Sequence, residues 1–181
     1  MVVEAFRGKM IHATSERRLP LVMEMTSRNC RSRPKEFYDR EFVAEYDGQR
    51  AGICVLRYHG DKNKFPGREE DLPSGFSCCD MCGLICLECG TNQDVSSGYC
   101  YLDHICVDSK FRGKGIGKQL MDIAEVDARK KGCRAIYLYV MTNNPAQHLY
   151  TRQGYNVTDT TCCCIWCTTG EKEAARMEKK L

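Results

Sequence analysis

The segment that decides the fold reads VDSKFRGKGIG and spans residues 107–117. It follows a β-like run at residues 99–107 and precedes an amphipathic helix. Glycines in such a turn let backbone N–H groups approach an anion, and the start of the helix adds partial positive charge. Arg112, Lys114 and Lys118 add formal charge. The segment therefore predicts an anion site at the beginning of a helix.

The spacing of these residues excludes two common phosphate sites. A P-loop ends in Gly-Lys-Ser/Thr, which is missing here. A dinucleotide-binding fold needs G-x-G-x-x-G and an acidic residue after the next strand. Here the glycines run G-x-G-x-G, and the next strand, IYLYVM, is followed by Thr142 and Asn143.

Alternating strands and helices extend outward from this segment. Asp47-Gly48 joins two strand-like runs, because that pair accepts positive φ in a hairpin. Gly132 is expected to end the helix, whose apolar positions are Ile116, Leu120, Ile123 and Ala124. The opposite, solvent-facing side of this helix is expected to carry Lys118, Asp122, Glu125 and Arg129. Asn144-Pro145 is expected to begin a second helix that carries Tyr150. The expected strands are residues 10–14, 41–46, 51–58, 99–107, 135–141, 155–159 and 174–180, and a helix is expected at residues 16–26.

Length and charge limit the class of protein. The 181 residues predict one domain over residues 10–181, with a tail at residues 1–9 and a cysteine-rich insertion at residues 60–98. A net charge of +3 argues against a nucleic-acid partner. No apolar run approaches the roughly 20 residues of a membrane span, so no transmembrane segment is expected. The sequence gives no indication of the oligomeric state.

Fourteen cysteines are the unusual feature of the composition. The start of the chain lacks the pattern of a secretory signal, which favours a reducing, cytoplasmic location. Two CxxC pairs, Cys79/Cys82 and Cys86/Cys89, offer zinc ligands, although the spacer between them is short for one zinc ion. Free thiols, disulfides and lipid attachment remain alternatives, and no metal ligand is assigned.

The motif at residues 107–117 resembles motif A of the GCN5-related N-acetyltransferase (GNAT) superfamily, whose signature is Arg/Gln-x-x-Gly-x-Gly/Ala. Downstream, NNPAQHLYTRQGY is similar to the family's Asn-x-x-Ala-x-x-x-Tyr-x-x-x-Gly-Phe/Tyr segment. The final RMEKKL resembles its closing strand. The resemblance implies an α/β fold with a mixed, mostly antiparallel sheet, flanked by helices and splayed where coenzyme A enters.

The same resemblance implies acetyl-CoA as the acyl donor. Backbone N–H groups of residues 113–118 would hold the pyrophosphate, and the edge of residues 105–107 would pair with pantetheine and polarise the thioester carbonyl. The implied cofactor-binding residues are Ile105, Cys106, Val107, Arg112, Gly113, Lys114, Gly115, Ile116, Gly117, Lys118, Asn143 and Tyr150.

Two catalytic roles also follow from the resemblance. Tyr150 would protonate the departing thiolate. The base in relatives often lies nine or eleven residues before the motif arginine, which here means Asp103 and Tyr101. Asp103 is preferred, with Tyr101 and Tyr139 assisting. Strand alternation places Tyr101, Asp103 and Ile105 on one side, with Leu102, His104 and Cys106 on the other, unless a bulge reverses it.

The function implied is N-acetylation of a primary amine by direct attack in a ternary complex. Small-molecule amines and peptide or protein amines are both open as acceptors. The alternative is a non-catalytic acyl-CoA-binding or metal-binding module whose cysteine-rich loops carry the function.

Overall fold

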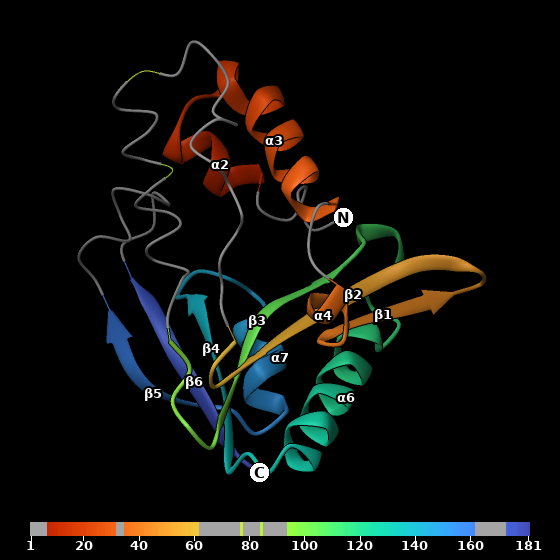
Figure 1. Cartoon of the computed structure of the whole chain (residues 1–181), viewed down its shortest axis with the longest axis vertical. Coiled ribbons are helices and arrows are strands. Elements are labelled where there is room, and N and C mark those ends of the chain that lie inside the picture. Colours follow the sequence, from red (N-terminus) through yellow and green to blue (C-terminus); the bar gives the residue numbers. More distant parts are fainter. Residues whose placement is uncertain (1–6, 32–34, 62–76, 78–83, 85–93, 162–172) are drawn as a thin grey trace.

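The protein was analysed as a computed structural model that describes residues 7–31, 35–61, 77, 84, 94–161 and 173–181. Figure 1 shows the elements in chain order. The elements, with their bounds, are α2 (Arg7–Ala13), η1 (Glu16–Arg18), α3 (Leu19–Arg31), α4 (Lys35–Tyr38), β1 (Glu41–Tyr46), β2 (Gln49–Tyr58), β3 (Tyr99–Val107), η3 (Ser109–Phe111), α6 (Ile116–Lys130), β4 (Ala135–Met141), α7 (Gln147–Arg152), β5 (Asn156–Thr161) and β6 (Ala174–Lys180).

The strands form one six-stranded sheet in the order β1-β2-β3-β4-β6-β5. Every neighbouring pair is antiparallel except β3 and β4, which are parallel. The expected mixed, mostly antiparallel α/β fold is therefore confirmed. The β1–β2 hairpin turns at Asp47 and Gly48, whose φ angles of 49° and 72° are those that a tight hairpin turn requires.

The main core lies between the sheet and α6. Leu56, Leu102 and Leu138 project from three strands toward Leu120 and Ala124 of α6. The apolar stripe of α6 is rotated from the expected one, because Met121 and Ala128 are buried whereas Ile123 is 46% exposed. The helix ends as expected at Gly132, whose φ is 74°.

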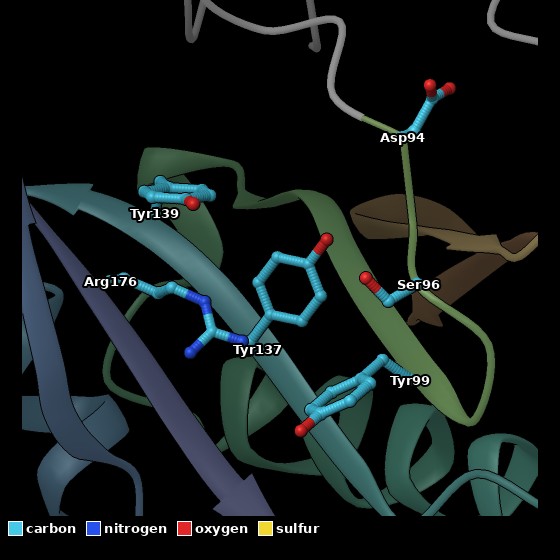
Figure 2. Close-up of a pocket in the computed structure, with 6 residues that line it drawn as sticks. All are labelled: Asp94, Ser96, Tyr99, Tyr137, Tyr139 and Arg176. Atoms are coloured by element: carbon cyan, nitrogen blue, oxygen red, sulfur yellow. The ribbon is translucent and has the colours of Figure 1, made fainter.

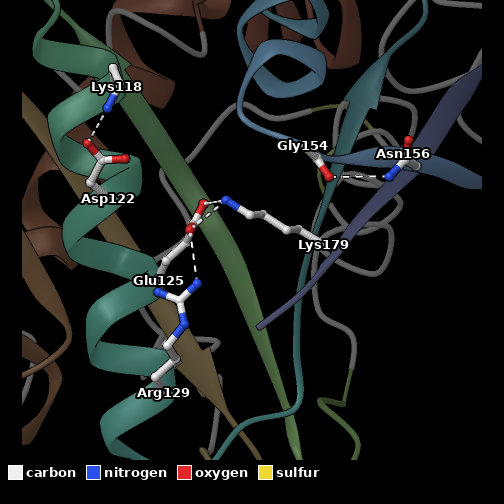
Figure 3. Close-up of polar contacts among 7 residues, drawn as sticks. All are labelled: Lys118, Asp122, Glu125, Arg129, Gly154, Asn156 and Lys179. Carbon is white, nitrogen blue, oxygen red and sulfur yellow. Dashed lines mark hydrogen bonds and ion pairs between the residues drawn. The ribbon is translucent and has the colours of Figure 1, made fainter.

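Glu125, expected on the solvent side of α6, is instead buried. Its two carboxylate oxygens each lie 2.7 Å from the Lys179 ammonium of β6, and Arg129 lies 3.5 Å away on the next turn (Figure 3). A buried carboxylate needs such partners, because an unpaired charge is costly to remove from water. The cluster links α6 to the strand beyond β4.

The N-terminal part differs from the expectation. The strand expected at residues 10–14 is replaced by α2, which includes Arg7–Ala13 and so begins within the expected tail at residues 1–9. Met10 of α2 packs against Leu19 and Val22 of α3 in a small second core. Alternation over five residues is too short to separate a strand from a helical turn, which explains the error. The division into one domain with an insertion stays a prediction, since most of residues 60–98 lie outside the described residues.

Candidate active site

A gap opens in the middle of the sheet where β3 and β4 diverge. Their parallel pairing covers three residue pairs, from Tyr99–Ala135 to Tyr101–Tyr137, although both strands continue further. The other edge of β4 pairs with β6 along its full length, and β2 pairs with β3 as far as Val107. Among the described strands, none pairs with the gap-facing side of β3 beyond Tyr101.

The glycine turn lies next to the end of β3. Asp108 accepts a hydrogen bond from the Lys110 N–H and starts the short η3 helix. Gly113 and Gly115 follow with φ angles of 77° and 79°, and a Cβ at either position would meet no atom of the described residues within 4 Å. Gly115 is the N-cap of α6, so the N–H groups of the first turn have no partner within the helix. The turn thus presents main-chain donors to open space.

The basic side chains around this turn are held by neighbours. The Arg112 guanidinium donates to the Val107 carbonyl at 3.3 Å. The Lys114 ammonium lies 4.0 Å from the centre of the Tyr46 ring. Lys118 pairs with Asp122 at 2.7 Å (Figure 3). All three remain exposed to solvent and near the turn, where they add positive charge without filling it.

Gly117 has a different environment from the other two glycines. A Cβ there would lie 3.1 Å from a methyl carbon of Leu149 in α7. The missing side chain therefore lets α6 and α7 pack closely together. This contact places Tyr150, on the next residue of α7, in the main core, where its side chain is 7% exposed. Burial raises the pKa of the Tyr150 phenol to about 12, so it stays protonated at neutral pH.

A β-bulge at Asp103 changes the direction of the side chains along β3. The pairing with β2 moves from Val55–His104 to Leu56–Leu102, which leaves Asp103 as the extra residue. Tyr101 and His104 therefore project from one face, opposite the core. The simple alternation expected from the sequence is wrong beyond Leu102.

The partners across β2 fix the remaining directions. Ile105 pairs with Cys54 and packs in the core, so it does not share the side of Tyr101 as expected. Cys106 pairs with Ile53 on the opposite face, together with His104, which is again the reverse of the expectation. We call this side of the sheet, which carries Tyr101, His104 and Cys106, the cleft face.

Asp103 lies between two basic side chains on the cleft face. Its carboxylate is 3.8 Å from the Arg57 guanidinium and 3.1 Å from Nδ1 of His104. Arg57 is also a cation over the Tyr101 ring, 5.3 Å from the ring centre. Arg57 had no sequence signal of its own, because a single arginine in an apolar strand does not reveal its partner.

Four tyrosines form an aromatic layer beside this group. The rings of Tyr101 and Tyr137 stack at 5.1 Å, and Tyr139 meets both edge-on at 6.1 Å. Tyr99 meets the edge of Tyr137 at 6.2 Å, and the Arg176 guanidinium lies 4.4 Å over the Tyr137 ring. A cavity of about 290 Å³ opens on this layer (Figure 2). Its lining residues are Asp94, Ser96, Tyr99, Tyr137, Tyr139 and Arg176.

Several of these residues were missed by the sequence reasoning. Alternation along β4 places Tyr137 with Tyr139, and that signal was available. Asp94 and Ser96 precede β3, whereas Arg176 lies far along the chain in β6. Only the fold brings these residues together around the cavity. Asn143, expected near pantetheine, is exposed in the turn between β4 and α7.

The cysteines of the two CxxC pairs lie outside the described residues, and so does the zinc site considered there. Among the residues that are described, no three His, Cys, Asp or Glu side chains are grouped as metal ligands would be. None of the described helices has the length and hydropathy that crossing a membrane requires.

Comparison with known proteins agrees with this architecture. The model of the acetyltransferase (GNAT) family matches residues 14–155. The chain is 35% identical over 75 residues to a chloroplastic GCN5-related N-acetyltransferase 6 of Arabidopsis thaliana, a stretch that covers 41% of this chain and 26% of the relative. The matched stretch thus spans about a quarter of that relative.

Two solved structures have the same fold. One is a crystal structure of an acetyltransferase, 25% identical, with a TM-score of 0.56 over 99% of this chain and 90% of the other. A Bacillus subtilis acetyltransferase in complex with CoA is 16% identical, with a TM-score of 0.54 over 81% and 80% of the two chains. The family model covers well over half of the chain. The chain therefore belongs to the GNAT acetyltransferase family.

Proposed function

We propose that the protein is an N-acetyltransferase that moves the acetyl group of acetyl-CoA to a primary amine. The observation that carries this proposal is the open glycine turn at the start of α6, next to the free edge of β3. A pyrophosphate fits main-chain donors at a helix start, and an extended pantetheine chain fits an unpaired strand edge. Family membership and the CoA-bound Bacillus subtilis relative support the same cosubstrate.

The proposed cosubstrate site has two parts. Backbone N–H groups from Gly113 to Lys118 hold the pyrophosphate, with Arg112 and Lys114 nearby. The strand edge of Ile105, Cys106 and Val107 pairs with pantetheine, and Asn143 contacts it from the turn after β4. A main-chain N–H of this edge polarises the thioester carbonyl as negative charge develops on its oxygen.

In the proposed reaction, the amine nitrogen attacks the thioester carbonyl carbon and the C–S bond then breaks. The thiolate that leaves takes a proton from Tyr150, whose raised pKa keeps its phenol protonated and able to donate. Burial also raises the pKa of the Cys106 thiol, the cysteine in the strand edge itself. A neutral thiol is a weak nucleophile, which supports direct transfer in a ternary complex over an acyl-cysteine intermediate.

The proton of the amine leaves on the cleft face. Asp103 is the candidate base, acting directly or through a neighbour, with Tyr101 and Tyr139 beside it. Burial raises the pKa of Tyr101, so its phenol stays neutral and can assist only by hydrogen bonding. The acceptor would enter over the aromatic layer, and both small amines and peptide or protein amines are compatible with an open cavity. A cytoplasmic location and a single domain over residues 10–181 stay predictions.

The test is product formation from deuterated acetyl-CoA with a panel of amines that includes polyamines, arylalkylamines, amino sugars and peptides. Mass spectrometry of the acetylated amine is preferable to a thiol reagent, because the 14 cysteines of the chain would react with the reagent. Initial-rate plots should intersect, as expected for a ternary complex. Tight acetyl-CoA binding with no product from any amine would favour the non-catalytic acyl-CoA-binding alternative.

A further inference from the structure

We infer that His104 is the group that takes the proton from the acceptor amine, and that Asp103 is a positioning residue that acts through it. This inference rests on the proposed acetyltransferase activity and names a residue that the sequence reasoning assigned to the opposite layer. The evidence is the bulge at Asp103, the contacts of its carboxylate and the order of burial among three side chains.

The bulge brings His104 to the reaction side of the sheet. In a regular strand His104 would lie on the face opposite Tyr101 and Asp103, and it would point into the core. The extra residue shifts the register, so that His104 pairs with Val55 and shares a face with Tyr101. His104 also lies beyond Tyr101, the last β3 residue paired to β4, and directly precedes the free edge that begins at Ile105. It is therefore next to the position proposed for the thioester.

Burial ranks the three charged or titratable side chains in a clear order. The side chains of Arg57, Asp103 and His104 are 1%, 7% and 20% exposed. Asp103 is thus enclosed between a buried guanidinium and an imidazole, whereas His104 is the member that reaches the open side. A base must come within hydrogen-bond distance of the proton that it abstracts, and His104 meets this requirement better than Asp103.

The contacts of Asp103 define its role. Its carboxylate lies 3.1 Å from Nδ1 of His104, an ion-pair distance that favours a proton on that nitrogen, although the two groups are not aligned as a hydrogen bond. We accordingly assign the tautomer in which Nε2 keeps its lone pair. Arg57, 3.8 Å from the carboxylate and fixed over the Tyr101 ring, holds Asp103 in place.

The proton balance is simple. The N–H bond of the bound ammonium breaks first and its proton binds Nε2, which leaves a neutral amine whose lone pair attacks the thioester carbonyl carbon. The imidazolium, next to the Asp103 carboxylate, then releases the proton to solvent. The other titratable side chains on this face of β2, β3 and β4 are Arg57, Cys106 and the four tyrosines of the aromatic layer.

The experiment is the dependence of kcat/KM on pH, between about pH 5 and 8 and above, for the full chain and three variants. Two acceptor amines of different basicity are needed. If the rise of kcat/KM with pH is due to an enzyme group, its midpoint stays at the same pH when the amine is changed. His104→Gln should lower kcat/KM by about 100-fold or more. It should also abolish the rise of kcat/KM with increasing pH, which is the ascending limb of the pH profile. His148→Gln, the same change at an exposed histidine, should behave as wild type.

Asp103→Asn separates positioning from direct catalysis. If Asp103 only positions His104, the Asp103→Asn variant loses rate but keeps the rise of kcat/KM with pH. Imidazole in the buffer should restore part of the activity of His104→Ala. Thermal unfolding and acetyl-CoA affinity confirm that each variant is folded.

Two outcomes would overturn the inference. A limb that survives His104→Gln but is lost in Asp103→Asn makes Asp103 the base itself. If the ascending limb survives in both variants, the pH dependence comes from the tyrosines or from the amine itself titrating in solution. If His104→Gln does not fold, loss of the rise in Asp103→Asn contradicts the inference, and recovery of activity by imidazole in His104→Ala supports it. An inactive wild-type protein with every amine is a different result, which rejects the acetyltransferase proposal instead.

Discussion

The glycine turn before α6 and the cleft face of β3 lie at opposite ends of the same short stretch of chain, yet they present different chemistry. The turn offers main-chain N–H groups, whose direction follows from the positive φ angles of Gly113 and Gly115. The cleft face offers side chains, whose direction depends on one extra residue at Asp103. A site made of backbone can be recognised from glycine spacing, whereas a site made of side chains depends on the register of its strand.

The largest expected effect is at Tyr150, which lies in the core on the face of the sheet opposite the cleft face. Tyr150→Phe keeps the ring in the core and removes only the proton donor. We expect kcat to fall by roughly 10²- to 10⁴-fold, the usual contribution of a general acid, while acetyl-CoA affinity stays within about twofold. Steady-state kinetics and calorimetry measure the two quantities separately. A wild-type kcat would make Tyr150 a packing residue.

The second prediction concerns the turn. Gly115→Asp places a carboxylate where the pyrophosphate is proposed to lie, so acetyl-CoA affinity should fall more than tenfold, which is more than about 1.4 kcal/mol. Gly115→Asn is the matched control, because Asn has nearly the same shape and also tolerates the positive φ of 79°. Calorimetry on both variants isolates the charge. Equal affinities for the two variants would argue against an anion at this position.

The third prediction compares buried tyrosines on the two faces. Burial raises the pKa of Tyr101 on the cleft face and that of Tyr150 in the core. Unfolded tyrosines ionise near pH 10, so above that pH the unfolded chain loses protons that the folded chain keeps. The free energy of unfolding should therefore fall as pH rises, by up to about 1.4 kcal/mol per pH unit for each such tyrosine.

Urea unfolding at pH 9, 10 and 11 measures this slope. Tyr101→Phe and Tyr150→Phe should each make the decline less steep, and Tyr38→Phe, at an exposed tyrosine, should leave it unchanged. A slope that neither buried variant alters would mean that these two phenols reach solvent.

The smallest effect is expected at Gly117, which resembles Gly115 in sequence but contacts α7. Gly117→Ala gains about 1 kcal/mol of helix propensity and brings a Cβ to 3.1 Å from Leu149, so we expect a net stability change within about 1 kcal/mol. In a Leu149→Ala background the same change should be stabilising. If it remains destabilising there, measured by thermal unfolding, contact with Leu149 is not the reason for the glycine.

Sequence patterns predicted the parts of the fold that depend on local chemistry. Asp47-Gly48, Gly132 and the glycine turn each specify their backbone, and the strands next to them followed at or near their observed limits. The bulge at Asp103 could not be predicted, because YCYLDHICV contains no glycine or other local mark of an inserted residue. Ile123 and Glu125 were misplaced because the rotation of a helix is fixed by its partners, here β6 and its Lys179.

The gap between β3 and β4 has a mechanical consequence. It divides the sheet into two blocks, one of β1, β2 and β3 with α6, the other of β4, β6 and β5. Three residue pairs join the blocks within the sheet, at the junction of β3 and β4, which we call the seam. The Glu125–Lys179 salt bridge also connects the two blocks. A junction this narrow resists rotation less than a fully paired strand does. The seam is therefore the least paired junction of the sheet, although the core residues of α6 pack against strands on both sides of it.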